Sequence, residues 1–178
     1  MRVVAGRFGG RRLTAPPGRG TRPTSDRVRE ALFSILGPVQ GAALDLYAGS
    51  GALGIEALSR GADRAVFVES DARAAGALKA NLEALQLEPP EVELRRRDVA
   101  AALRDARQRG ETYSLVLCDP PYRHAAGLEE PLSEALGPLL ESSGRVVTES
   151  DRRQPLSLTL PLIDERRYGD TLIRIHQP

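Results

Sequence analysis

The sequence ALDLYAGSGALG, residues 43–54, contains an apolar run that leads directly into the glycine pattern G-x-G-x-x-G. A short apolar run before such a loop predicts a buried β-strand, and the third glycine falls where a helix would begin. Glycines at these positions permit a sharp turn and let backbone N–H groups approach a ligand closely. The stretch therefore predicts the first strand and helix of a ligand-binding α/β sheet.

The rest of the chain repeats this strand-helix unit. The predicted strands are 42–47, 64–69, 92–97, 113–118 and 144–149, and the predicted helices between them are 51–60, 71–86, 99–109 and 128–141. Such alternation predicts a doubly wound, mainly parallel sheet. After residue 150 two apolar runs, 156–163 and 171–176, flank Tyr168-Gly169-Asp170 with no room for a helix, which predicts an antiparallel pair. This ending is typical of Rossmann-like class I methyltransferases, whereas nicotinamide-binding domains usually end in another parallel unit.

A short basic segment precedes the sheet. Residues 2–4 and 12–14 form β-like runs around Gly9-Gly10, a dipeptide that suits a tight hairpin turn. We therefore predict a β-hairpin extension at residues 1–20 and a main domain at residues 21–178. A helix is expected from the capping candidates at residues 24–26 to Gly37-Pro38, because apolar residues recur between them at helical spacing.

Composition narrows the class of protein. The chain has 178 residues, 41% of them hydrophobic, which fits one domain with a short appendage. No apolar run approaches the roughly 18 residues that span a bilayer, and Gly6 interrupts the N-terminus before a signal-peptide core. Cys118 is the only cysteine, which disfavours a cysteine metal site. We expect a cytoplasmic protein with no membrane partner and no metal.

Charge is distributed unevenly along the chain. The net charge is +1, yet residues 1–29 contain eight arginines and one acidic residue, a net charge of +7, so the remainder carries −6. A basic segment on an acidic body predicts a patch for an anionic polymer such as a nucleic acid. The alternative is a solvated arm that has no partner.

Two acidic residues distinguish the cofactors that this loop could bind. Glu69 follows the second strand, where a carboxylate can accept hydrogen bonds from both ribose hydroxyls of an adenosine. Asp45 lies four residues before Gly49, where it can face the positively charged methionine end of S-adenosylmethionine. A dinucleotide would place a pyrophosphate near Asp45, which would repel it. The sequence therefore favours S-adenosylmethionine over NAD.

A third acid follows the third strand. Asp98 is placed to accept a hydrogen bond from the adenine amino group, with Val99 as an apolar contact, although a plain helix N-cap would look the same. The predicted cofactor-binding residues of the sheet are Asp45, Tyr47, Ala48, Gly49, Ser50, Gly51, Gly54, Glu69, Ser70, Asp98 and Val99.

The predicted chemical site is Asp119-Pro120-Pro121-Tyr122, directly after the fourth strand. Ligands bind at the carboxyl ends of the strands in open α/β sheets. The double proline fixes two φ angles and removes two N–H donors, which leaves a stiff loop that presents carbonyl acceptors. Elsewhere such a string would be only a rigid turn.

The residue types of this loop suit methylation of an exocyclic amine on a nucleic-acid base. The lone pair of such an amine is delocalised into the ring, so the nitrogen is a poor nucleophile. Hydrogen bonds from its two protons to Asp119 and to the Pro120 carbonyl would hold it toward the methyl group and stabilise the developing charge. Tyr122 could stack on a base turned out of its helix or loop.

The sequence resembles the RsmD-type methyltransferases, which make N2-methylguanine in 16S ribosomal RNA. The resemblance covers nearly the whole chain and lies in residues 3–13, 45–54, 119–122 and 168–171, and most specifically in Arg-Pro-Thr-Ser-Asp-Arg-Val-Arg-Glu, residues 22–30. It implies a guanine substrate in 16S rRNA, presented within a partly or fully assembled 30S subunit. It also implies that Thr24, Asp26 and Arg27 line the methionine end of the cofactor pocket. The predicted RNA-binding residues are Arg7, Arg11, Arg12, Arg19 and Arg22.

Other functions remain as alternatives. Another amino-methyltransferase, acting on adenine N6 or on a protein glutamine, would use the same loop, but DNA enzymes usually carry a separate target-recognition domain. A non-catalytic RNA-binding assembly factor would not need intact cofactor and chemical loops. A nicotinamide-dependent oxidoreductase leaves the Asp119–Tyr122 loop unexplained.

Overall fold

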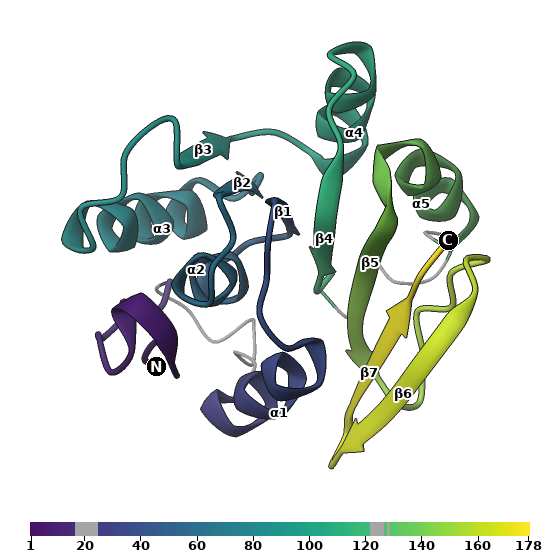
Figure 1. Cartoon of the computed structure of the whole chain (residues 1–178), viewed down its shortest axis with the longest axis horizontal. Helices are drawn as coiled ribbons and strands as arrows, with labels where there is room; N and C mark the ends of the chain where they lie inside the picture. Colours follow the sequence, from purple (N-terminus) through teal and green to yellow (C-terminus); the bar gives the residue numbers. More distant parts are fainter. Residues whose placement is uncertain (17–24, 122–126, 128) are drawn as a thin grey trace.

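The computed structural model describes residues 1–16, 25–121, 127 and 129–178. In this part of the chain a seven-stranded sheet has the order β3-β2-β1-β4-β5-β7-β6 (Figure 1). The strands are β1 (Ala42–Leu46), β2 (Arg64–Val68), β3 (Val92–Arg95), β4 (Tyr113–Cys118), β5 (Leu140–Asp151), β6 (Leu162–Tyr168) and β7 (Thr171–His176). Strands β1 to β5 are parallel, and β7 runs antiparallel to both β5 and β6. The predicted parallel sheet with an antiparallel end is confirmed.

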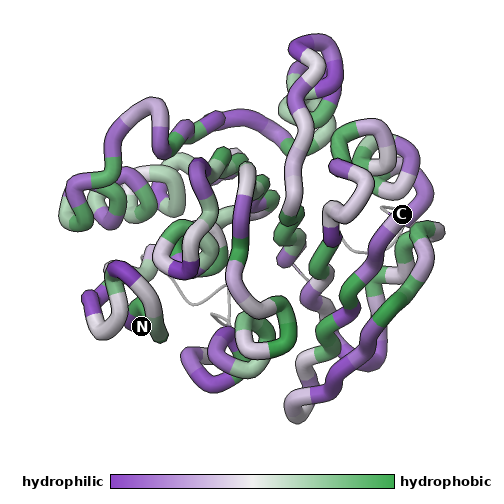
Figure 2. The backbone as a smooth tube through the Cα atoms, in the orientation of Figure 1, coloured by the Kyte–Doolittle hydropathy of each residue, from purple (hydrophilic) through white to green (hydrophobic). Residues whose placement is uncertain are grey.

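Helices cover both faces of the sheet and create two hydrophobic clusters. They are α1 (Asp26–Leu36), α2 (Ala52–Ser59), α3 (Ala72–Ala84), α4 (Val99–Gln108) and α5 (Glu129–Leu136). The first cluster joins α1, α2, α3 and the N-terminal segment to one face, and the second joins α4 and α5 to the other. Hydrophobic and hydrophilic residues alternate along α1, α3 and α4 (Figure 2), because each of these helices buries one side, whereas α2 is buried at every residue from Leu53 to Ser59. No helix in the described part of the chain is long and apolar enough to cross a bilayer.

The helix predicted at 128–141 is wrong over its last residues. Helix α5 ends at Leu136, a 3-10 helix (η3) follows at Gly137–Leu139, and β5 begins at Leu140. Pro138 has no N–H to donate to a further helical turn, so it ends the α-helix here. Strand β5 is consequently much longer than the predicted strand 144–149.

The strand predicted at 156–163 is also wrong, because β6 is Leu162–Tyr168. Leu156 and Leu158 are buried in the second hydrophobic cluster, and the Thr159 N–H donates to Ser133 Oγ of α5 at 2.9 Å. The apolar pattern at 156–160 therefore reflects packing on α5 and not membership of the sheet. The second predicted strand, 171–176, is confirmed as β7.

The N-terminal segment pairs with itself, and the predicted turn at Gly9-Gly10 is confirmed. Arg2 and Arg12 form an isolated antiparallel bridge, and the Arg11 N–H donates to the Phe8 carbonyl at 3.0 Å across the turn. A 3-10 helix, η1 (Gly6–Phe8), which the sequence did not predict, precedes the turn. Gly6 has a φ of +79°, and an added Cβ would lie 1.8 Å from the Ser59 carbonyl oxygen. Gly6 thus lets η1 pack closely on α2. The predicted domain boundary at residue 20 lies outside the described residues.

Glu56 of α2 anchors this segment to the main domain. Its fully buried carboxylate accepts hydrogen bonds from the N–H groups of Val4 at 2.7 Å and Ala5 at 3.1 Å. It also accepts a bond from Arg60 Nε at 2.7 Å and lies 3.7 Å from Nε of the buried Arg29. One carboxylate therefore satisfies two backbone donors and balances two arginines, so α1, α2 and the N-terminal segment depend on it.

Glu56→Gln is expected to lower the free energy of unfolding by about 3 kcal/mol, because the buried Arg29 loses one of its two acidic partners and the bonds to Val4 and Ala5 weaken. Urea unfolding at neutral pH measures this change. Glu83→Gln is the matched control, since Glu83 forms an exposed pair with Lys79 on α3 and should change stability by less than about 0.5 kcal/mol. Equal stability of the two variants would show that Glu56 does not hold the segment.

Candidate active site

The predicted site residues converge at the carboxyl ends of the parallel strands. Asp45 lies near the end of β1, and Glu69, Asp98 and Asp119 follow β2, β3 and β4. Since β3, β2, β1 and β4 are consecutive neighbours in the sheet, these four acidic residues lie along one edge. That edge is where open α/β sheets bind their ligands.

The glycine loop after β1 turns sharply at this edge. Gly49 and Gly51 have φ angles of +56° and +79°, a region that other residues rarely adopt. The Gly51 N–H donates to the Ala48 carbonyl at 2.7 Å, and the Ala48 N–H donates to the Val68 carbonyl at 3.0 Å. A Cβ added at Gly49 would meet no atom closer than 3.9 Å, so the backbone there faces open space. The loop can therefore receive a ligand at Gly49.

Gly54 serves a different purpose in the same motif. A Cβ at this position would lie 2.4 Å from Phe67 Cε1 of β2 and 3.0 Å from Asp45 Oδ2. Its absence lets the first turn of α2 lie directly against the sheet, where the Gly54 N–H donates to Asp45 Oδ2 at 2.8 Å. The third glycine of the motif is thus a packing residue, and its predicted cofactor contact stays a prediction.

Burial perturbs the Asp45 carboxyl. The side chain is 1% exposed, and burial raises its pKa from 3.8 to about 8, with a lowering contribution from the Gly54 N–H and a raising one from Glu69. A cation placed against Asp45 would therefore favour its ionised form and be favoured in return. This position suits the positively charged end of a ligand, and the predicted contact of Asp45 with the methionine end of the cofactor stays a prediction.

Glu69 ties the glycine loop to the end of β2. Its Oε2 accepts from the Gly49 N–H and its Oε1 from the Asp71 N–H, both at 2.8 Å. A carboxylate has about four acceptor positions, so two remain for ligand hydroxyls. The half-buried Glu69 is thereby held in one orientation beside the loop.

Asp98 and Tyr47 take positions beside this loop. The exposed Asp98 caps α4, since its Oδ1 accepts from the Ala101 N–H at 2.8 Å, while Val99 is buried. The N-cap role is therefore present, and the proposed adenine contact would use the remaining acceptor positions of the carboxylate. Tyr47 adopts a φ of +59°, and burial, followed by Cys118 and Asp98, raises its pKa to about 12. Its phenol stays neutral at physiological pH.

Ser50 and Ser70 differ in their surroundings. Ser50 is buried and its Oγ donates to Met1 Sδ at 3.3 Å, so its side chain contacts the N-terminal segment, whereas Ser70 is exposed. The Ser50 carbonyl accepts from Nδ2 of the buried Asn81 at 2.9 Å, and the same amide donates to the Thr14 carbonyl. Sequence reasoning missed Asn81, whose only signal is a polar residue on the apolar face of α3.

Asp119 and the two prolines occupy the end of β4. Burial raises the pKa of the half-buried Asp119 carboxyl well above its usual range, and Glu149 and Asp45 raise it further. None of the described residues donates a hydrogen bond to this carboxylate. Pro120 is buried and Pro121 is exposed, while Tyr122 lies outside the described residues. The Asp119 oxygens can therefore accept hydrogen bonds from a ligand.

The structure describes some of the N-terminal residues that were predicted to bind the cofactor or the RNA. Asp26 pairs with Arg29 at 2.8 Å and with Arg2 at 3.6 Å, and Arg27 is exposed. Arg7 and Arg11 also have protein partners, since Arg7 Nη2 lies 2.5 Å from Glu91 Oε1 and Arg11 Nη2 donates to the Ala84 carbonyl at 2.8 Å. Arg12 is exposed, and the predicted residues Arg19, Arg22 and Thr24 lie outside the described residues.

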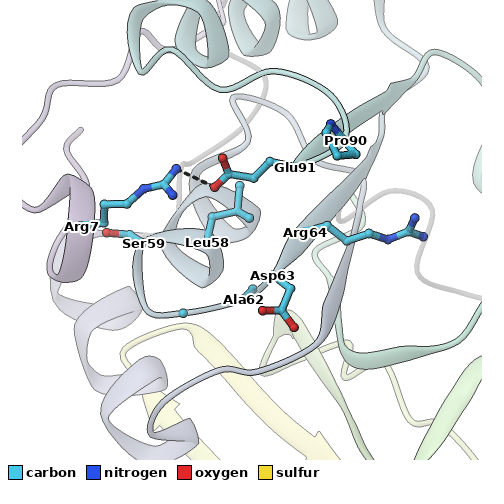
Figure 3. A pocket seen from close by; sticks show the side chains of 9 residues that line it. Arg7, Leu58, Ser59, Ala62, Asp63, Arg64, Pro90 and Glu91 are labelled. Atoms are coloured by element: carbon cyan, nitrogen blue, oxygen red, sulfur yellow. Dashed lines mark hydrogen bonds and ion pairs between the residues drawn. The ribbon is translucent and has the colours of Figure 1, made fainter.

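A surface pocket of about 650 Å³ lies away from the predicted site. Figure 3 shows Arg7 and Glu91 paired across it, with Asp63 and Arg64 nearby. Arg64 begins β2, so this pocket is at the amino ends of the strands, opposite to the glycine loop. None of the predicted cofactor residues lines it.

Comparisons with known proteins agree with the fold. A family model described as "Conserved hypothetical protein 95" matches residues 1–177. Ribosomal RNA small subunit methyltransferase D of Escherichia coli K12 is 39% identical over 152 residues, which cover 84% of this chain and 71% of that protein. A solved hypothetical protein of Thermus thermophilus is 31% identical with a TM-score of 0.81, covering 100% of this chain and 99% of that chain.

The fold extends to more distant proteins. A SAM-dependent methyltransferase of Agrobacterium tumefaciens superposes with a TM-score of 0.65 over 94% of this chain and 66% of that chain, at 18% identity. This likeness shows the fold, which is the Rossmann-like class I methyltransferase fold predicted from the sequence.

Gly54→Ala is expected to lower the free energy of unfolding by about 1–3 kcal/mol, because the added methyl group forces α2 away from Phe67 and lengthens the bond to Asp45. Gly76→Ala in α3 is the control, since its Cβ would meet no atom within 4 Å and should stabilise the helix by up to about 1 kcal/mol. Thermal and urea unfolding of both variants measure the difference. Two variants of equal stability would contradict the packing role of Gly54.

Proposed function

Because this chain belongs to the Conserved hypothetical protein 95 family, that of the RsmD-type methyltransferases, we propose that it transfers the methyl group of S-adenosylmethionine to the exocyclic N2 of a guanine in 16S ribosomal RNA. The observation that carries the proposal is the position of Asp119-Pro120-Pro121. This loop follows β4 directly, on the strand next to β1 and its glycine loop. Cofactor and acceptor would therefore meet at one edge of the sheet.

The cofactor would lie against the acidic edge described above. Glu69 has acceptor positions for the ribose hydroxyls, and the backbone at Gly49 faces open space for the ligand. Asp45 would face the positively charged methionine end, with Asp26 and Arg27 contributing from the start of α1. S-adenosylmethionine supplies an electrophilic methyl group on a sulfonium ion.

The acceptor amine would be held by the loop after β4. One amino proton would be donated to the Asp119 carboxylate and the other to the Pro120 carbonyl, which keeps the nitrogen lone pair directed at the sulfonium methyl. In the transition state the nitrogen gains positive charge, and Asp119 would stabilise that charge at short range. The raised pKa of Asp119 also suits it to take up the proton that the methylated amine releases. Positioning and charge stabilisation together suffice, since a strong base is not required.

The basic N-terminal segment would hold the RNA. Arg7 and Arg11 each use part of their guanidinium for a protein contact and keep donors at the surface, and Arg12 is exposed beside them. With Arg19 and Arg22 they would neutralise backbone phosphates next to the catalytic domain. We propose that residues 1–20 form this extension, that residues 21–178 form the catalytic domain, and that the RNA is presented within a partly or fully assembled 30S subunit.

Loss of this gene is expected to remove the N2 methyl group from one guanine of 16S rRNA, as measured by mass spectrometry of nuclease fragments. The wild-type gene should restore the methyl group. Asp119→Ala should not, because removing the carboxylate that stabilises the transition state costs about 100- to 1,000-fold or more in rate. Purified Asp119→Ala should still bind the cofactor. Full methylation in the deletion strain would refute the substrate, and full restoration by Asp119→Ala would refute the mechanism.

The affinity for S-adenosylmethionine is expected to rise with pH up to about 8. In the free protein Asp45 is largely protonated below that pKa, and the cationic cofactor favours the ionised form, so binding releases a proton. Below pH 8 the affinity gain is at most about tenfold per pH unit. Calorimetry at several pH values in buffers of different ionisation enthalpy measures both effects.

Asp45→Asn serves as the control for this pH dependence. It keeps an acceptor for the Gly54 N–H but cannot ionise, so the dependence should become shallower. The product S-adenosylhomocysteine has no sulfonium charge and should also show a weaker dependence. Identical pH profiles for the wild type and Asp45→Asn would exclude Asp45 as the group that faces the cation.

A further inference from the structure

Glu149, on β5, lies next to Asp119 on the same face of the sheet. The ladder between β4 and β5, which run side by side (Figure 1), pairs Leu117 with Val147 and Cys118 with Thr148, so Asp119 and Glu149 are the next residues along it. Side chains alternate between the two faces of a sheet, and Leu117 and Val147 both belong to the first hydrophobic cluster. Asp119 and Glu149 therefore follow on that face.

The carboxylates of Asp119 and Glu149 can both accept hydrogen bonds, and their negative charges repel each other. Glu149 is 4% exposed, and it is the largest charged contributor to the raised pKa of Asp119 after burial itself. On its other side β7 places Ile173 beside Glu149, so this flank is apolar. Two adjacent ionised carboxylates repel each other, and hydrogen-bond donors or positive charge placed against both reduce that repulsion. A ligand with two neighbouring donors would suit this pair.

Guanine presents such donors. On its Watson–Crick edge the N1–H lies beside the N2 amino group, whereas adenine and cytosine each place a ring-nitrogen acceptor beside the amino group. An ionised carboxylate can only accept, so it would bind the N1–H of guanine and repel the ring nitrogen of the other two bases. Enzymes that turn a base out of the stack read this edge by hydrogen bonds.

Resting on the proposed function, we propose that Glu149 is a specificity-determining residue, whose carboxylate accepts the N1–H of the target guanine while Asp119 accepts a proton of its N2 amino group. The two acceptors come from neighbouring strands, whose backbones lie about 4.8 Å apart, and the longer Glu149 side chain can reach the adjacent donor of the same base. The acid pair selects guanine, and the loop after β4 presents the amine for methylation.

The test replaces the target guanine in a 16S RNA substrate with 2-aminopurine, which keeps the 2-amino group but has an unprotonated N1. Single-turnover methylation of both substrates is measured for the wild type and for Glu149→Gln. The wild type should prefer guanine by about 10- to 100-fold, the discrimination expected from a good paired contact to a base. Glu149→Gln should methylate guanine more slowly and lose most of this preference, because its amide N–H can donate to the unprotonated N1.

Glu141→Gln is the matched control, because Glu141 lies at the opposite end of β5 and should keep the wild-type preference. 2-Aminopurine also lacks O6, but losing a contact to O6 would slow every variant by the same factor. A difference between variants in the preference for guanine over 2-aminopurine therefore reports a contact to N1. Cofactor binding by Glu149→Gln, measured by calorimetry, verifies that the variant is folded.

The outcomes separate this inference from the proposed function. N2-methylguanine formed by Glu149→Gln with the wild-type preference would overturn the role of Glu149 and leave the function intact. Absence of N2-methylguanine with the wild-type enzyme would overturn both. If Glu149→Gln does not fold, Glu149→Asp replaces it: the shorter side chain keeps the charge but falls short of N1, so the preference for guanine should again shrink. An unchanged preference in Glu149→Asp would overturn the inference.

Discussion

The hydrogen bond from the Gly54 N–H to the buried Asp45 carboxylate is the interaction on which this site depends. It requires α2 to lie directly on the sheet, which the missing Cβ of Gly54 allows next to Phe67. Once α2 is held there, the chain between β1 and α2 must turn within a few residues, and Gly49 and Gly51 supply the backbone conformations that this needs. Glu69 then fastens the turn to the end of β2. The shape of the loop follows from the packing of one helix.

Several acidic residues lie close together at the same edge of the sheet, and their repulsion lowers the stability of the ligand-free protein. Burial raises the pKa values of both Asp45 and Asp119. Glu69 raises the pKa of Asp45 further, and Glu149 and Asp45 raise that of Asp119. Such an arrangement weakens the fold unless a bound partner offsets it. The proposed ligands would provide that offset, a sulfonium cation on one side and the amino and N1 protons of guanine on the other. Groups that weaken the free protein would then serve function, as at many active sites.

The N-terminal segment illustrates how one buried acid can connect a charged surface to the core. Glu56 accepts bonds from Val4 and Ala5 and lies close to Arg29, and Asn81 links Thr14 to the carbonyl of Ser50 in the glycine loop. The segment is therefore bonded to α2 and linked through Asn81 to the glycine loop. RNA bound to its arginines would be held at a defined distance from the methyl donor, because the attachment is made through buried groups.

Sequence alone determined the parts of this protein whose signals are local. The glycine pattern at 49–54, the apolar strands and the loop at Asp119 are readable because turn geometry and burial act on neighbouring residues. The tertiary structure decided the rest. Residues 156–160 proved to pack on α5 and not to form a strand, and Glu149 became a neighbour of Asp119 only through the register of β4 and β5. Pairing between distant segments depends on the whole sheet, so no local pattern could reveal it.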